Sequence, residues 1–132
     1  CAVLEIDGQP QASMVGKIHI DSKFEFYDFE AKYLDGATDI ELPAPIDKKV
    51  ADAIGAAAVK AFKALGCSGL ARVDFFLTQT NQIVINELNT MPGFTSTSVF
   101  PKMWGASGIT YTEVITHLLK SALKRTNGVL GN

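Results

Sequence analysis

The stretch Leu70–Asn89, which reads LARVDFFLTQTNQIVINELN, decides the fold of this chain. Two runs rich in β-branched and aromatic residues, 70–77 and 83–88, are separated by the five polar residues of TQTNQ. Apolar runs of this length on either side of a short polar link are typical of two antiparallel strands joined by a turn. The stretch therefore predicts a β-hairpin at the centre of the fold.

Polar side chains interrupt these two runs at matching positions. Arg72 and Asp74 lie in the first run, Glu87 lies in the second, and Asn89 follows it directly. The antiparallel register that places Asp74 opposite Glu87 also places Arg72 opposite Asn89. Residues two apart in a strand point to the same side of the sheet. We therefore expect the four side chains to form one patch, provided that no bulge interrupts the register.

The chemistry of this patch indicates a cation. Directly opposed carboxylates, such as those of Asp74 and Glu87, destabilise a strand pair unless positive charge lies between them. Carboxylate and amide oxygens suit Mg²⁺ or Mn²⁺, and the lack of nearby His or Cys argues against zinc. Because Mg²⁺ usually takes one or two carboxylates plus substrate phosphates, the patch predicts a phosphate ligand, which Arg72 would also attract.

A plainer interpretation is a surface hairpin in which Arg72 forms a salt bridge with Asp74 or Glu87. The other face of the hairpin bears on this choice. The apolar residues that alternate with the patch predict a packed face, and Ile85 adds apolar surface beside the patch. A hairpin packed on one side favours a metal–phosphate site over a solvated salt bridge. The residues of the predicted packed face are Val73, Phe75, Val84 and Leu88.

The sequence before the hairpin predicts three strands and a long loop. Cys1–Ile6 is apolar and ends at a turn pair, and Ala12–Ile20 alternates as a second strand. Phe24–Tyr27 is a short aromatic strand. Residues 28–42 show no clean periodicity, and an irregular loop of this length is often a functional lid.

Helices are predicted on both sides of the hairpin. Asp47 is a suitable N-cap for a helix that ends near Leu65, where a glycine follows. Residues 98–107 predict a short helix, and a capping box at Thr110 precedes a last helix over 111–124. We therefore expect an α+β fold, with a mainly antiparallel sheet and helices packed against it.

Length and composition exclude several classes of protein. The 132 residues suit a single domain, and the net charge of −2 without a run of Lys or Arg argues against a nucleic-acid surface. No apolar stretch approaches the roughly 20 residues of a membrane span. Cys1 and Cys67 are interpreted as reduced thiols. Because the chain begins with Cys1, it is expected to be a piece of a longer polypeptide.

Three motifs, two in and after the hairpin and one before it, resemble a known family. Arg72-Val-Asp74, followed by Asn86-Glu-Leu-Asn-Thr-Met-Pro-Gly93, resembles the metal signature of the ATP-grasp superfamily. The continuation Phe94–Ser98 and the segment Tyr27–Tyr33 resemble the D-alanine–D-alanine ligase family within it. The resemblance implies that residues 1–132 form the C-terminal part of an ATP-grasp domain. Its parts would be a lid loop at about 28–42, a metal-binding hairpin over 70–89, and a substrate loop with C-terminal helices over 90–126.

The resemblance also implies roles for the patch and the loop that follows it. Asp74 would hold one Mg²⁺ or Mn²⁺, Glu87 would bridge two, and Asn89 would hold the second, so that the metals clamp the phosphates of ATP. Arg72 would stabilise charge on the acyl-phosphate and the tetrahedral intermediate. Two more groups belong to the substrate site: the backbone N–H of Gly93 as an oxyanion donor, and Ser98 as a ligand for the carboxylate of the second D-alanine.

Four further residues receive roles from the resemblance. Lys32 would reach the transferred phosphate and Tyr33 would pin the lid, although a solvated lysine and a packing tyrosine are the plainer interpretations. Phe26 would line the adenine, or would be an ordinary core aromatic. Asn86 lies beside the metal acid and could touch the nucleotide, but strand alternation would direct it away from the patch.

The implied activity is the ATP-dependent joining of two D-alanines through an acyl-phosphate, for peptidoglycan precursor synthesis in the cytoplasm. ATP and D-alanine would be the small-molecule partners, without nucleic acid or membrane, and the full-length enzyme could be a homodimer. One alternative is another ATP-grasp ligase, such as a D-alanine–D-lactate ligase. Another is a catalytically incompetent fragment that binds only Mg²⁺-nucleotide.

Overall fold

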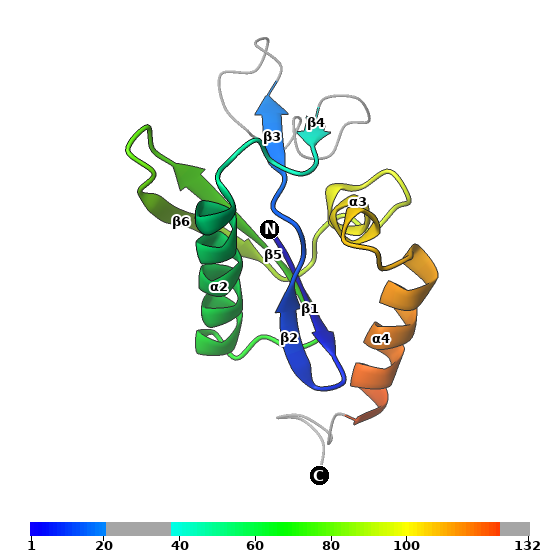
Figure 1. Cartoon of the computed structure of the whole chain (residues 1–132). Helices are drawn as coiled ribbons and strands as arrows, with labels where there is room; N and C mark the ends of the chain where they lie inside the picture. Colours follow the sequence, from blue (N-terminus) through cyan, green and yellow to red (C-terminus); the bar gives the residue numbers. More distant parts are fainter. Residues whose placement is uncertain (21–37, 125–132) are drawn as a thin grey trace.

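The structure, a computed structural model, describes residues 1–20 and 38–124 (Figure 1). Its main body is a four-stranded antiparallel sheet with helices on both faces, which confirms the predicted α+β class. A separate two-stranded sheet lies beyond one end of it. In chain order the elements are β1 (Ala2–Ile6), β2 (Gln9–Ala12), β3 (Lys17–Ile20), β4 (Thr38–Glu41), α2 (Lys48–Ala64), β5 (Leu70–Leu77), β6 (Ile83–Asn89), α3 (Val99–Ala106) and α4 (Tyr111–Lys124).

Strand β1 lies inside the sheet, whose order is β2-β1-β5-β6. It pairs with β2 on one side and with β5 on the other, where Ala2 opposes Arg72 and Leu4 opposes Leu70. Both faces of β1 are covered by helices. This burial explains why its first three residues, Ala2–Leu4, are all apolar, since a strand with one solvated face would alternate between apolar and polar residues.

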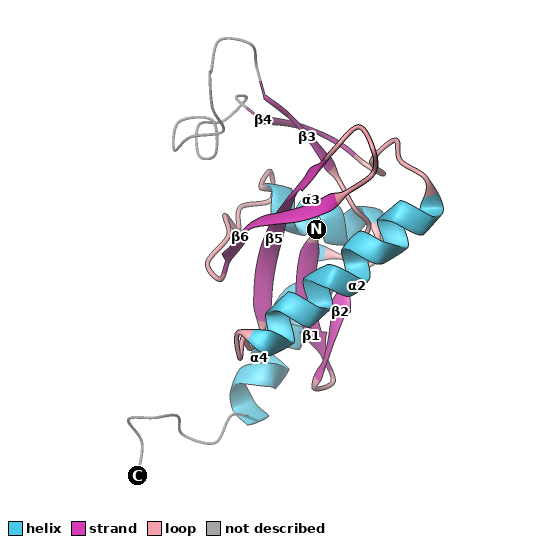
Figure 2. Cartoon of the chain, turned by 90° about the vertical axis from the view of Figure 1, so that its left-hand side faces the viewer, coloured by secondary structure: helices cyan, strands magenta, loops and turns pink. Residues whose placement is uncertain are grey.

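Each face of the sheet has its own hydrophobic core. Helix α2 covers one face, as Figure 2 shows from the side on which this helix lies, and α3 and α4 cover the other. Alternate residues of β1 divide between the two cores, because successive side chains of a strand point to opposite faces. The core under α2 contains Cys1, Val3, Ile54, Ala58, Phe62, Ala71 and Val73. The core under α3 and α4 contains Ala2, Leu4, Phe100, Met103, Trp104 and Val114.

The strand predicted over Ala12–Ile20 is wrong, because the structure divides it between β2 and β3. The chain leaves the main sheet at Ser13, whose buried hydroxyl accepts a hydrogen bond from the N–H of Ala2 at 3.0 Å and donates one to the carbonyl of Met14 at 2.8 Å. These bonds satisfy backbone groups at the point where the ladder ends. The strand predicted over Phe24–Tyr27 lies outside the described residues.

The loop predicted over residues 28–42 is wrong at its end, because Thr38–Glu41 forms β4 and pairs with β3. In this pair Ile40 opposes Ile18, and Ile40 packs against the core under α3 and α4. A four-residue strand is too short for its alternation to show in the sequence, so tertiary packing decides its conformation. The part of the predicted loop over 21–37 lies outside the described residues.

The helix predictions are confirmed. Asp47 is the N-cap residue of α2, although its side chain makes no capping hydrogen bond. The capping box before α4 is fully formed. The N–H and the hydroxyl of Thr110 both donate to Glu113 Oε2 at 2.7 Å, and the N–H of Glu113 donates to Thr110 Oγ1 at 3.3 Å. These bonds lower the pKa of the Glu113 carboxyl.

The backbone of Cys1 continues the pairing of β1 with β5. Its nitrogen donates a hydrogen bond to the carbonyl of Val73 at 2.9 Å, and the N–H of Val73 donates to the carbonyl of Cys1 at 2.8 Å.

Candidate functional site

The predicted register of the central hairpin is confirmed at the patch. Across β5 and β6, Arg72 opposes Asn89 and Asp74 opposes Glu87. Leu70, on the same face of β5 as Arg72, packs against the core under α3 and α4. The patch therefore lies on the α3/α4 face of the sheet, beyond the edge of this core.

A β-bulge directly follows the patch. The next pairs are Phe75 with Ile85 and Phe76 with Val84, which leaves Asn86 as an extra residue in β6. Beyond an extra residue in one strand, the side chains of that strand lie on the opposite face of the sheet from the one expected without it. The faces predicted for two residues are therefore wrong. Val84 lies on the same face as the patch, and Ile85 pairs with Phe75 on the α2 face.

The bulge also reveals two residues that sequence reasoning missed. Phe76 lies on the same face of β5 as Arg72 and Asp74, and its partner Val84 lies beside it. Phe76 is 62% exposed and Val84 is 41% exposed, so together they form an apolar surface next to the carboxylates. Alternation in β5 alone could have placed Phe76 on this face. Nothing in the sequence could have placed Val84 there without knowledge of the bulge.

Arg72 supplies the positive charge that the opposed carboxylates require. It is only 5% exposed, and its Nε and Nη2 donate to the two carboxylate oxygens of Asp74 at 2.8 and 2.9 Å. Its Nη2 lies 4.0 Å from Glu87 Oε1. The salt bridge with Asp74 that the plainer interpretation expected is therefore present. Bidentate pairing of this kind fixes the geometry of both side chains.

The oxygen ligands of the patch are few but of a suitable kind for a hard cation. Among the described residues, no group of three or more His, Cys, Asp or Glu side chains comes together as a metal site. Asp74 and Glu87 supply two carboxylates, and Asn89 Oδ1 accepts a hydrogen bond from the N–H of Met91 at 2.9 Å. Because Mg²⁺ needs only one or two carboxylates when phosphates and water complete its shell, these residues fit such an ion.

The loop that follows the hairpin brings Gly93 and Ser98 together. A Cβ placed on Gly93 would lie 3.1 Å from Ser98 Oγ, so the close approach of the two residues favours glycine here. Ser98 is the N-cap residue of α3, but its hydroxyl makes no capping bond. Instead Ser98 Oγ accepts a hydrogen bond from the N–H of Thr95 at 3.0 Å, which leaves the N-terminus of α3 without a side-chain cap.

The remaining predicted site residues are not brought together in the described part of the chain. Phe26, Lys32 and Tyr33 lie outside the described residues. Asn86 is exposed beside Glu87, and because it is the bulge residue itself, strand alternation does not decide to which side its side chain points.

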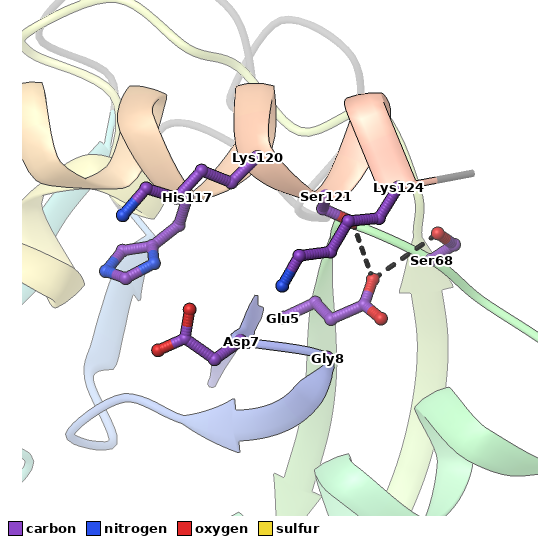
Figure 3. Close-up of a pocket in the computed structure, with 8 residues that line it drawn as sticks. All are labelled: Glu5, Asp7, Gly8, Ser68, His117, Lys120, Ser121 and Lys124. Atoms are coloured by element: carbon purple, nitrogen blue, oxygen red, sulfur yellow. Dashed lines mark hydrogen bonds between the residues drawn. The ribbon is translucent and has the colours of Figure 1, made fainter.

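A cavity of about 120 Å³ lies elsewhere, between the β1–β2 turn and α4 (Figure 3). It is at the opposite end of β1 from Ala2, which pairs with Arg72. Inside it Glu5 Oε2 accepts hydrogen bonds from the N–H of Gly69 at 2.9 Å and the hydroxyl of Ser121 at 2.9 Å. These bonds tie α4 to the start of β5. The lining residues are Glu5, Asp7, Gly8, Ser68, His117, Lys120, Ser121 and Lys124, none of which is a predicted site residue.

None of the helices in residues 1–20 and 38–124 has the length and apolar character needed to cross a bilayer.

Comparisons with known proteins show which protein family the chain belongs to. The family model described as "D-ala D-ala ligase C-terminus" matches residues 1–120. The chain is 48% identical to the D-alanine–D-alanine ligase of Mycobacterium avium over 98% of its own length and 36% of that protein. It is 47% identical to the ligase of Frankia casuarinae over 98% of its length and 34% of that protein. The chain thus spans about a third of the curated relatives it matches.

Solved structures resemble the fold over almost the whole chain. The D-alanine–D-alanine ligase from Coxiella burnetii superposes with a TM-score of 0.77 at 37% identity, covering 95% of this chain and 31% of that one. The VanG D-Ala:D-Ser ligase from Enterococcus faecalis gives 0.75 at 42% identity, covering 91% and 34%. A Bacillus anthracis ligase complexed with ATP gives 0.69 at 25% identity, covering 93% and 37%.

Proposed function

Because this chain belongs to the D-alanine–D-alanine ligase family, we propose that the complete protein joins two D-alanine molecules at the expense of ATP. The product would be D-alanyl-D-alanine, for peptidoglycan precursor synthesis in the cytoplasm. The observation that carries the proposal is the pairing of Asp74 with Glu87 beside the buried Arg72, on the face that leads into the Gly93–Ser98 loop. Two carboxylates and a guanidinium at one place suit a phosphate-bearing substrate.

The metal ions of the reaction would be held at the patch. Asp74 would bind one Mg²⁺ or Mn²⁺, Glu87 would bridge two, and Asn89 would complete the second site through its amide oxygen. Bound there, the ions would neutralise the phosphate oxygens of ATP and orient the γ-phosphate. Glu87 suits the bridging role because its side chain is 41% exposed, whereas that of Asp74 is 11% exposed and held on one side by Arg72.

The base of the nucleotide would lie against the apolar surface next to the patch. Phe76 and Val84 present that surface at directly paired positions of the same two strands. An exposed aromatic ring offers a stacking face for a nucleobase, a kind of contact that does not depend on which base is bound. Phe26 and Asn86 would contribute to the same pocket, Phe26 by lining the adenine and Asn86 by touching the nucleotide.

The bond-forming groups would lie between the patch and α3. The carboxylate of the first D-alanine attacks the γ-phosphate, and ADP leaves as the acyl-phosphate forms. The amine of the second D-alanine then attacks the acyl carbon, and phosphate leaves. Arg72 would stabilise the charge that develops on the phosphoryl and acyl groups, and the N–H of Gly93 would donate to the oxyanion. Ser98 and the uncapped N-terminus of α3 would bind the carboxylate of the second D-alanine.

Lid closure would complete the site. Lys32 would reach the transferred phosphate and Tyr33 would hold the lid over the second substrate, so that water is excluded from the acyl-phosphate. The lid residues would also decide which second substrate the enzyme accepts. D-lactate is the alternative acceptor, and the likeness to a D-Ala:D-Ser ligase adds D-serine.

The complete enzyme, incubated with D-alanine, ATP and Mg²⁺, should release ADP and D-alanyl-D-alanine in equal amounts. Mass spectrometry identifies the product, and parallel reactions with D-lactate or D-serine as the second substrate test the acceptor. The 132-residue chain by itself should give no dipeptide, because it spans only about a third of its relatives. A complete enzyme that hydrolyses ATP without forming a dipeptide, or that prefers another acceptor, would contradict the proposal.

A further inference from the structure

The first residue of α4 contacts the loop that follows the central hairpin. The hydroxyl of Tyr111 donates a hydrogen bond to the backbone carbonyl of Phe94 at 2.8 Å. The two rings also pack together, with centroids 5.4 Å apart and an interplanar angle of 39°. Phe94 packs on Phe100 of α3 as well, with centroids 5.9 Å apart. Phe94 is thus held between two helices, with its backbone carbonyl bonded to the Tyr111 hydroxyl.

The loop on either side of Phe94 carries the group assigned to the oxyanion and the group assigned to the second substrate. Gly93 precedes Phe94 directly, and the hydrogen bonds between Thr95 and Ser98 follow it. The N–H of Ser98 donates to the carbonyl of Thr95 at 3.0 Å, and the two hydroxyl oxygens lie 2.8 Å apart. A displacement of the Phe94 backbone would therefore be passed to Gly93 on one side and to Ser98 on the other.

We propose that Tyr111 is a positioning residue for the second substrate: its hydroxyl holds the Phe94 backbone so that Gly93 and Ser98 keep their relative placement. Tyr111 is 39% exposed and does not belong to the buried core, so its hydroxyl contributes mainly through this single bond. The inference rests on the proposed function, because that function gives the loop its substrate role. The hydrogen bond from Tyr111 to Phe94, called the clamp below, does not depend on that function.

Tyr111→Phe in the complete enzyme tests both the clamp and its positioning role, because it keeps the ring and removes only the hydroxyl. Loss of one neutral hydrogen bond corresponds to a change of about 2- to 10-fold in an equilibrium. We expect the KM for the second D-alanine to rise and kcat to fall, each by about this factor, because Ser98 and the oxyanion donor Gly93 both lose their placement, with the KM for ATP within about twofold of the parent. Hydrogen exchange at the amides of Thr95 and Ser98 should become faster.

A matched control is available on the same helix. Thr116 Oγ1 donates to the carbonyl of Thr112 at 2.8 Å, a bond within α4 that does not involve the loop. Thr116→Val removes that hydroxyl and should leave the KM for the second D-alanine and the exchange of the loop amides unchanged. An effect of equal size in this control would show that Tyr111→Phe acts by weakening α4 in general, and would overturn the positioning role.

Amide exchange tests the clamp, and the KM values test the positioning role. Unchanged exchange at Thr95 and Ser98 in Tyr111→Phe would overturn the clamp. Faster exchange with an unchanged KM for the second D-alanine, or an equal rise in the KM for ATP, would overturn the positioning role while the clamp stands. A parent enzyme that forms no dipeptide would overturn the proposed function and the substrate role with it, and the exchange result would still decide the clamp.

Discussion

Glu87→Gln in the complete enzyme should lower kcat by at least about 100-fold and leave the fold intact, as expected when an electrostatic contact made in the transition state is lost. The substitution keeps the shape of the side chain and removes the charge proposed to bridge two cations. The fold should tolerate the change, because the Glu87 side chain is 41% exposed and its oxygen lies 4.0 Å from the guanidinium of Arg72. Steady-state rates over a range of Mg²⁺ concentrations measure the loss, and thermal unfolding checks the fold.

Two further variants calibrate this result. Asn89→Ala removes one neutral ligand and should cost less activity than Glu87→Gln, with a higher Mg²⁺ requirement. Asp52→Asn removes a carboxylate from an exposed pair with Lys48, with 2.7 Å between the nearest atoms, and should leave kcat unchanged. Activity near the parent level in Glu87→Gln would remove Glu87 from the mechanism and with it the proposed two-metal arrangement.

Arg72→Met should lower the free energy of unfolding by about 3–5 kcal/mol, the cost typical of removing one partner from a buried ion pair. Methionine fills a similar length but leaves the Asp74 carboxylate without its two hydrogen bonds and directly opposite Glu87. The Asp74 side chain is only 11% exposed, so water cannot fully replace the lost guanidinium. Urea unfolding at pH 7 measures the change.

The double variant Arg72→Met/Asp74→Asn tests the cause. It removes the buried negative charge together with its partner, so it should recover much of the stability that Arg72→Met loses, because a pair removed as a whole leaves no unpaired ion. A double variant that is as unstable as the single one would indicate that Arg72 stabilises the fold through packing of its alkyl chain rather than through Asp74.

Much of the fold and of the patch could be predicted because it depends on local patterns. The positions of Arg72, Asp74, Glu87 and Asn89 on one face require only alternation within two strands and a register, and the register is set by two apolar runs of defined length. The capping box at Thr110 is similarly local, because its partners are three residues apart and bond within one helical turn.

The same locality explains the errors. The bulge at Asn86 shifts the pairing by one residue, and nothing in the alternation of β6 indicates it, because both faces of this strand carry apolar residues beyond the bulge. Pairing of Thr38–Glu41 with β3 likewise depends on contacts between segments distant in sequence. Such contacts, rather than intrinsic propensity, decide short strands.

The sequence by itself determined which residues could form the site, since their chemical types and their spacing within strands and turns are properties of the local chain. Only the tertiary structure decided how they are arranged. It pairs Arg72 with Asp74 at 2.8 Å and leaves Glu87 at 4.0 Å, and it places Phe76 and Val84 beside the carboxylates. It also joins Tyr111 to Phe94, across 17 positions of sequence. These arrangements follow from packing on both faces of one sheet, which acts on all the strands together and leaves no local trace in the residues concerned.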